Sequence, residues 1–219
     1  WTSHSANHIS AIIGALPSLD DQTSSNLLFV MKKSADVSVF AKAKINDIDN
    51  PTELGFLSPT VPTDFPIADF SIMSGDGIGL GKEYLVVTGG KNAKNELINR
   101  SWIIQELTGN KIEAVKGYKD DYCEYKYGVT TFAYAKEMYM ISNDSIYTSN
   151  GYGAHWTKAD EKKVFQEDII ENGMDMPSVV VDKDNFVWVF GGKYKKEGAT
   201  YSDKIWRGRL NKLTHKRIK

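Results

Sequence analysis

A short apolar segment recurs four times in this chain, and this recurrence is the feature that most constrains the fold. The four copies are residues 27–30, 84–87, 138–141 and 187–190. Short apolar runs bounded by turn residues predict buried β-strands. Their spacing is close to the period of ~50 residues that is typical of chains built from repeated β-units. We therefore expect four sheets of one design, placed one after another.

Two of these copies share a longer pattern of glycine and tryptophan. The second runs into Gly89 and Gly90 and is followed by Trp102, and the fourth runs into Gly191 and Gly192 and is followed at a similar distance by Trp206. Paired glycines at the end of a buried strand permit positive φ and close approach of the neighbouring backbone. The large tryptophan ring begins a further strand and fills the space between twisted sheets. The glycine pairs and both tryptophans are predicted to have structural roles.

Further strand candidates complete each unit. Residues 9–13, 70–73, 129–133 and 178–181 precede the central strands, residues 37–41, 102–104, 145–148 and 205–210 follow them, and residues 54–57, 112–115 and 156–158 are the outer candidates. The sequence thus predicts an all-β chain of four antiparallel units, with approximate boundaries 9–58, 68–117, 128–160 and 177–219. Residues 160–172 carry several helix formers, so a short helical insertion between two units competes there with an irregular connection.

At residues 187–192 and 202–206 the sequence resembles the kelch-like β-propellers. The wider sequence, including residues 206–213, resembles an uncharacterised family of exported bacterial proteins of lipoprotein type. The resemblance implies a kelch-like propeller of about four visible blades in a position outside the cytoplasm, without an assigned activity. It also implies a lipid anchor. Four repeats of ~50 residues use the whole chain, and Trp1-Thr2 resembles Trp156-Thr157 at the start of an outer strand, so we expect further strands upstream of Trp1. We therefore expect the 219 residues to form an incomplete ring.

A second resemblance falls on the third unit. Ser149, Gly153 and Trp156 match the Asp-box turn of sialidases and related propellers, while Gly151 stands where the motif has its aspartate. In those families the box is a structural hairpin on the rim. It therefore predicts a turn with a buried tryptophan and no chemistry.

Composition excludes several classes of function. Lysine and arginine number 27 against 28 aspartate and glutamate residues, so no broad positive surface for nucleic acid is expected. A single cysteine, Cys123, cannot form a disulfide within the chain. The apolar runs are far shorter than the ~20 residues that a membrane helix needs.

The candidate metal and phosphate sites each have a simpler interpretation. Residues 75–82 are rich in glycine, but Glu83 follows Lys82 where a phosphate loop needs Ser or Thr, and a strand follows, so a hairpin is favoured. His4 and His8 lack a third ligand nearby. Residues 182–185, like Asp47 and Asp49, lack the glycine and distal glutamate of a calcium loop. We expect no metal and no cofactor.

Catalytic constellations are also poorly supported. A sialidase would need an arginine cluster, yet Arg207, Arg209 and Arg217 crowd the C-terminal end and leave Arg100 alone elsewhere. His155 and His215 have no visible carboxylate or nucleophile partner. A glycan-active hydrolase, with paired carboxylates drawn from different blades, is the alternative that sequence leaves open.

The best ligand candidates are tyrosines in the segment between the second and third units. Tyr118, Tyr122, Tyr125 and Tyr127 offer flat apolar rings with polar tips, suited to sugar or peptide contacts, although such tyrosines also pack between blades. The sequence favours a non-catalytic extracytoplasmic binding module for a glycan or a protein. The alternatives are the hydrolase and a purely structural domain of a larger exported protein. Self-association, or cover by an upstream segment, is expected for an incomplete ring.

Overall fold

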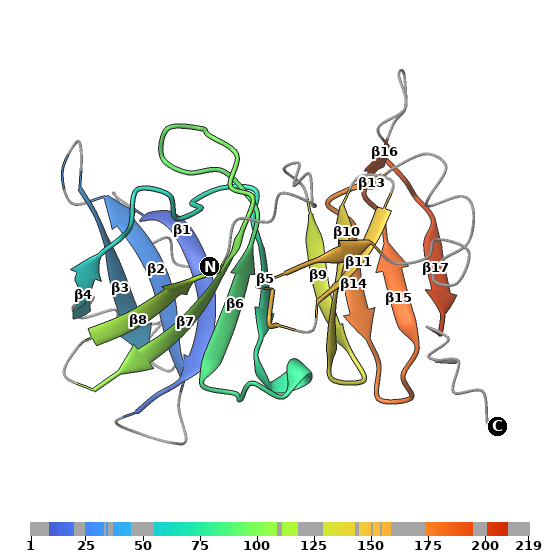
Figure 1. Ribbon diagram of the computed structural model, residues 1–219, viewed down its shortest axis with the longest axis horizontal. Coiled ribbons are helices and arrows are strands. Elements are labelled where there is room, and N and C mark those ends of the chain that lie inside the picture. The colour runs from blue at the N-terminus through green and yellow to red at the C-terminus, as the bar shows by residue number, and fades with distance from the viewer. Residues whose placement is uncertain are drawn as a thin grey trace, which may run out of the picture.

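The computed structural model describes residues 9–19, 25–32, 34, 37–44, 55–108, 111–117, 129–142, 145–149, 151–153, 155–158, 174–194 and 201–209. In these ranges the regular structure is β-strand, apart from the short 3-10 turn η2 (Asp76–Ile78). The strands form four successive units, which we call blades 1 to 4 (Figure 1). The all-β, propeller-type fold predicted from the sequence is confirmed. The proposed helix at 160–172 lies outside the described residues.

Each blade is built from strands that are consecutive in the chain. Blade 1 has β1 (Ile9–Pro17), β2 (Ser25–Lys32), β3 (Ser38–Lys44) and β4 (Gly55–Thr60); blade 2 has β5 (Ser71–Ser74), β6 (Tyr84–Thr88), β7 (Ser101–Leu107) and β8 (Lys111–Lys116). Blade 3 has β9 (Thr130–Tyr134), β10 (Glu137–Ser142), β11 (Ser145–Ser149) and β12 (Thr157–Lys158). Blade 4 has β14 (Ser178–Val181), β15 (Val187–Phe190) and β17 (Ile205–Gly208), accompanied by the small ladder of β13 (Met174–Asp175) and β16 (Lys193–Tyr194).

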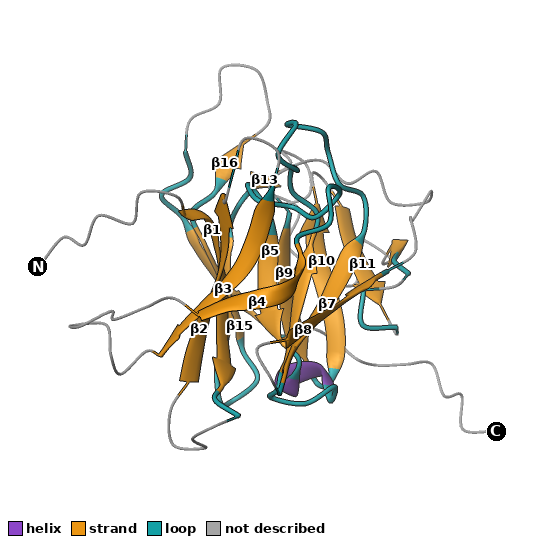
Figure 2. Ribbon diagram, turned by 90° about the vertical axis from the view of Figure 1, so that its left-hand side faces the viewer, coloured by secondary structure: helices purple, strands orange, loops and turns teal. Residues whose placement is uncertain are grey.

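Pairing within the blades is antiparallel, as the alternating strands predict. Blades 1 and 2 differ from the expected separate sheets, because β4 and β8 pair in parallel at Ser58 and Lys111. This pairing produces one sheet of eight strands in the order β1-β2-β3-β4-β8-β7-β6-β5. Figure 2 shows β4 and β8 meeting near the side of the molecule that faces the viewer.

Blades 2 and 4 have the same backbone register around their tryptophans. Trp102 pairs with Val87, two residues before Gly89, and Trp206 pairs with Val189, two residues before Gly191. The first glycine of each pair also donates to the residue two before the tryptophan, over 3.1 Å in blade 2 and 3.3 Å in blade 4. The slightly longer interval between glycines and tryptophan in blade 4 is therefore taken up in the connection and leaves the strands unchanged.

The second glycine of each pair continues the correspondence. Gly90 O accepts from Ile98 N at 2.9 Å, and Gly192 O accepts from Ser202 N at 2.8 Å. The φ angles of Gly90 and Gly192 are 92° and 97°, values that disfavour side chains. At Gly90 a Cβ would also lie 2.5 Å from Ala68 O, so close approach of the backbone is a second reason for glycine there.

Three apolar clusters join the four blades into a continuous series. The cluster between blades 1 and 2 contains Ala11, Ile13, Leu16, Leu28, Val30, Phe40, Leu57, Phe65, Leu85, Val87, Trp102, Ile104 and Ile112. The cluster between blades 2 and 3 contains Met73, Ile78, Val86, Val129, Met138, Met140 and Trp156. The cluster between blades 3 and 4 contains Phe132, Tyr134, Tyr139, Ile141, Ile146, Val187 and Val189, with Trp206 packed against it. We call the face of a blade that meets the preceding blade its front face, and the opposite one its back face.

A buried charge adds to the contact between blades 1 and 2. The Glu106 side chain is only 2% exposed and forms an ion pair with Lys42 of β3. Its second carboxylate oxygen accepts from Asn26 Nδ2 of β2 at 2.9 Å. Both partners come from blade 1, so this carboxylate links the two blades through polar bonds inside an otherwise apolar contact.

Candidate functional site

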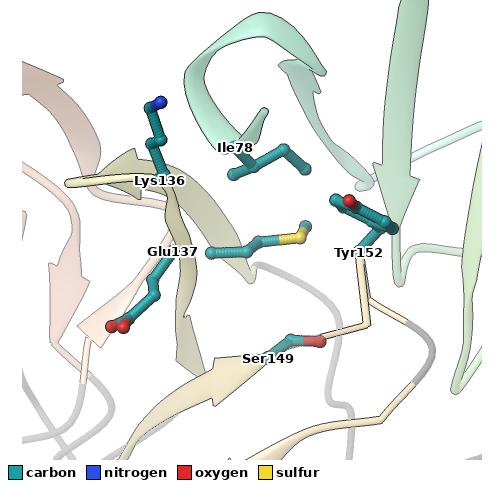
Figure 3. Close-up of a pocket in the computed structure, with 6 residues that line it drawn as sticks. Ile78, Lys136, Glu137, Ser149 and Tyr152 are labelled. Carbon is teal, nitrogen blue, oxygen red and sulfur yellow. The ribbon is translucent and has the colours of Figure 1, made fainter. Parts of the chain in front are cut away.

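A small cleft opens where blades 2 and 3 meet, and we take it as the candidate site. It has a volume of about 160 Å³ and is lined by Ile78, Lys136, Glu137, Met138, Ser149 and Tyr152. Figure 3 shows these side chains around the opening, with Ile78 from blade 2 and the others from blade 3. The cleft therefore depends on how the two blades pack together.

The blade 2 wall comes from the glycine-rich segment 75–82. This segment connects β5 and β6, and Gly75 N donates to Tyr84 O at 2.8 Å, which closes a hairpin as the sequence predicts. A Cβ at Gly75 would lie 2.7 Å from Gly81 O, so the glycines serve the tight turn. Ile78, 5% exposed, is the apolar side chain that this turn places against blade 3.

The opposite wall begins with the two-residue turn between β9 and β10. Ala135 and Lys136 have φ angles of 47° and 64°, the left-handed pair that a tight hairpin turn requires. Tyr134 pairs with Glu137 across the turn. Lys136 and Glu137 therefore stand next to each other on a tight hairpin at the cleft, with the Glu137 carboxylate turned away from Ile78 and Tyr152 (Figure 3).

The turn after β11 completes the cleft. Ser149 Oγ accepts from Gly153 N at 3.0 Å and from Gly151 N at 3.4 Å, so a serine hydroxyl organises the turn where Gly151 leaves no side chain. Trp156 is 3% exposed within the cluster between blades 2 and 3. A Cβ at Gly153 would lie 2.5 Å from Ser101 Oγ, because the turn packs directly on blade 2. Tyr152 is left 38% exposed beside the cleft.

Glu137 is held in place by a buried neighbour. Tyr139 donates its hydroxyl to Glu137 Oε2 at 3.0 Å. Burial, together with this bond, raises the pKa of Tyr139 far above its usual value, so the phenol remains a donor at neutral pH. Among the described residues that line the cleft, Glu137 is the one carboxylate. Its carboxylate lies with Tyr139 on the face of blade 3 that packs toward blade 4, so the described lining of the cleft lacks the carboxylate pair of a glycosidase.

The other candidate sites named in the sequence analysis lie away from this cleft or outside the described residues. Residues 182–185 form a hairpin turn in which Asp182 Oδ1 accepts from Asp184 N and Phe186 N, both at 2.9 Å. Within the described ranges, no group of three His, Cys, Asp or Glu side chains could hold a metal ion. Tyr118, Tyr122, Tyr125 and Tyr127, and likewise His4, His8, Asp47 and Asp49, lie outside the described residues.

Sequence reasoning placed two of the cleft residues in motifs, Ser149 in the Asp-box-like turn and Ile78 in the glycine-rich segment, and it missed Lys136, Glu137 and Tyr152. The nearest signal is the short polar interruption at residues 135–137 between two alternating strands, which predicts a turn and no ligand. The glycine pairs and Trp102, Trp156 and Trp206 contribute packing and turn geometry.

The repeated antiparallel blades and the clusters between them define a β-propeller domain. The chain belongs to the family described as the DUF6242 beta propeller domain, whose model matches residues 1–218. Comparison with curated proteins finds no match. Among solved structures, the chain is similar to the one titled "Structure of YjhT", with a TM-score of 0.54 and 9% sequence identity over 80% of this chain.

This chain spans 50% of the length of the YjhT chain, and at 9% identity the likeness shows the fold alone. In the ranges that the structure describes, no helix has the length and hydropathy needed to cross a membrane.

Proposed function

We propose that this chain is a non-catalytic binding module of the kelch-like propeller type, and that it recognises one sugar unit of a glycan at the cleft between blades 2 and 3. The observation that carries the proposal is the grouping of Lys136 and Tyr152 around an opening of about 160 Å³. Lys136 supplies a donor and Tyr152 a flat ring at this opening, whereas the Glu137 carboxylate is turned away toward Tyr139 (Figure 3). A site of this kind is suited to recognition.

The chemistry of Lys136 and Tyr152 fits a sugar ring. The exposed face of Tyr152 offers an apolar surface on which the C–H face of a sugar can stack. Lys136 can donate to ring hydroxyls, and the Tyr152 hydroxyl can donate to them or accept from them. Left-handed backbone at Lys136 and Tyr152, with φ of 64° and 54°, fixes both side chains on tight turns before a ligand arrives.

The kelch-like repeat, the Asp-box hairpin and the location outside the cytoplasm each have separate support. The matching registers around Trp102 and Trp206 support a kelch-like repeat. The hydroxyl-organised turn at Ser149 supports a variant of the Asp-box hairpin. A location outside the cytoplasm rests on the resemblance to exported proteins, and fractionation of the full-length protein in its native cell would test it.

A binding screen run beside a hydrolysis assay tests the proposed function. We expect the chain to bind at least one glycan on an array without releasing product, and Tyr152→Ala to weaken that binding by about tenfold or more. Tyr201→Ala is the matched control, because Tyr201 is an exposed tyrosine of blade 4, far along the chain from the cleft. Binding that survives Tyr152→Ala would exclude this site. Product release would favour the hydrolase, and capture of peptides alone would favour a protein ligand.

A further inference from the structure

The back face of blade 4 carries a row of aromatic side chains. Val189 of β15 packs in the cluster between blades 3 and 4, on the front face. Because side chains alternate along a strand, Phe186, Trp188 and Phe190 lie on the opposite, back face. Arg207 of β17 pairs with Trp188 and shares that face. None of the three apolar clusters of the described structure covers it.

Two guanidinium groups lie over the rings of this face. The guanidinium carbon of Arg207 lies 3.7 Å from the centre of the Phe186 ring and 4.9 Å from that of Trp188. The guanidinium carbon of Arg209 lies 4.2 Å from the centre of the same Phe186 ring. A stacked guanidinium keeps N–H donors along its edge, in a planar arrangement that matches a carboxylate. The aromatic row therefore holds two positive charges close together at the surface.

The described residues supply no carboxylate partner to these two charges. Within the described ranges neither Arg207 nor Arg209 forms an ion pair, and Arg209 donates instead to the backbone Asp184 O at 3.3 Å. Asp182 belongs to the same hairpin, but its oxygens already accept from Trp188 Nε1 and from two backbone N–H groups. The guanidinium edges are therefore available to an anion from outside the described structure.

A face that another blade of this chain covers is built differently. In the register that blades 2 and 4 share, Trp188 occupies the position of Val86, and Arg207 occupies that of Ile103. Val86 and Ile103 both pack in the apolar cluster beneath blade 3. A charge at the position of Ile103 would be costly under an apolar neighbour unless that neighbour paired with it. The back face of blade 4 therefore calls for an occupant that carries negative charge.

The contact between blades 1 and 2 shows how this protein pairs a cation on such a face. Lys42 of β3 lies opposite Leu28, a member of the apolar cluster on the back face of blade 1. Its ammonium group forms an ion pair with the buried Glu106 carboxylate of blade 2. A carboxylate set among apolar side chains thus meets a cation from the third strand of a sheet. Arg207 also belongs to the third strand of its sheet, so the same complement fits blade 4.

We propose that the back face of blade 4 binds a segment of a partner protein that presents carboxylate side chains between apolar ones. Arg207 and Arg209 bind the carboxylates, while Val180 and Ile205, which are 54% and 62% exposed, contact the apolar side chains. Aromatic residues and arginine are the usual anchors of protein contacts.

Two other occupants fit this face less well. The described strands of blade 1 contain no aspartate or glutamate, so a second copy of this chain that offered blade 1 would bring no carboxylate from them. Asp182 and Asp184 lie in the hairpin beside the two arginines and interrupt the continuous positive track that a nucleic-acid backbone requires. An acidic protein segment is therefore the occupant that charge favours.

Selection of short random peptides on the purified 219-residue chain tests this proposal. We expect the recovered peptides to be enriched in Asp and Glu beside apolar residues, and their affinity to fall with added salt. The double variant Arg207→Gln/Arg209→Gln should weaken their binding by about tenfold or more, because the peptide carboxylates lose their partners. Lys111→Gln is the matched control, since it removes an exposed positive charge from β8 of blade 2. Circular dichroism checks that each variant is folded.

Charge reversal gives a sharper test. Selection on the variant Arg207→Glu/Arg209→Glu should recover basic peptides in place of acidic ones, an exchange that a loss of packing alone would not produce. Recovered peptides without acidic residues, or binding that is unchanged in the glutamine variant, would overturn the proposal.

Three further results would assign the face to another occupant and so overturn the proposal. A dimer in light scattering that needs Arg207 would assign the face to a second copy of the chain. Displacement of the peptides by a single-stranded oligonucleotide would assign it to nucleic acid. Failure of the full-length protein to bind the same peptides would show that its own polypeptide covers the face.

Discussion

Trp188 donates its indole Nε1–H to Oδ2 of Asp182 over 2.8 Å, across the β14–β15 hairpin of blade 4. The other carboxylate oxygen, Oδ1, accepts from the backbone of Phe186 and Asp184. The Trp188 bond is the main reason that the pKa of Asp182 is lowered, and the two backbone bonds add to it. The charged carboxylate is therefore part of the folded hairpin.

The lowered pKa predicts how stability depends on pH. A carboxyl whose folded pKa is depressed contributes stability above its unfolded pKa of ~3.9, and this contribution is lost as the pH falls through the folded value. Melting temperatures measured from pH 6 to pH 2 should fall in acid, and less steeply for Asp182→Asn, which has no carboxylate to protonate. Equal slopes for both proteins would contradict the role given to Asp182.

Gly90 and Gly191 should respond differently to alanine. Both have positive φ, so alanine introduces backbone strain of about 1 to 2 kcal/mol at either position. At Gly90 the new Cβ would also lie 2.5 Å from Ala68 O, whereas at Gly191 the nearest atom is Ser202 O at 3.7 Å. We expect losses of about 2 to 5 kcal/mol for Gly90→Ala and about 1 to 2 kcal/mol for Gly191→Ala in urea denaturation. Similar losses of stability for the two variants would show that the contact with Ala68 adds little to the cost of Gly90→Ala.

Trp156 should matter for stability far more than its neighbour Tyr152. Trp156 is 3% exposed in the cluster between blades 2 and 3, so Trp156→Ala should cost about 3 to 5 kcal/mol. Tyr152→Ala removes an exposed ring and should change the free energy of unfolding by about 0.5 kcal/mol or less. A loss below about 1 kcal/mol for Trp156→Ala in denaturant melts would remove the buried-tryptophan assignment.

The buried carboxylate of Glu106 gives a further prediction. Glu106→Ala leaves the Lys42 charge and the Asn26 amide without this partner, and should cost about 3 to 5 kcal/mol. The double variant Lys42→Met/Glu106→Leu should recover about 2 kcal/mol of that loss, because no uncompensated charge stays buried. Chemical denaturation of the two variants measures the difference. A double variant no more stable than Glu106→Ala would show that packing, rather than charge, sets the cost.

The strands were predictable because a buried strand has a local sequence pattern of apolar residues. Apolar runs such as residues 84–87 and 187–190, and the glycines that end them, depend on the immediate chain alone. The parallel pairing of β4 with β8 was missed, because it rests on one residue pair between segments that lie far apart in the sequence. The cleft was missed for a similar reason, because Ile78 and Tyr152 meet only when two blades pack. The predicted tyrosine site stays a prediction.

That single residue pair between Ser58 and Lys111 has a mechanical consequence. Blades 1 and 2 share a continuous hydrogen-bonded sheet, whereas the described strands of blades 3 and 4 belong to separate sheets. A chain stretched from its two ends would thus meet resistance that increases from the C-terminal side inward. In a force spectrometer blade 4 should detach first and blade 3 next, and the last and largest rupture should release blades 1 and 2 together.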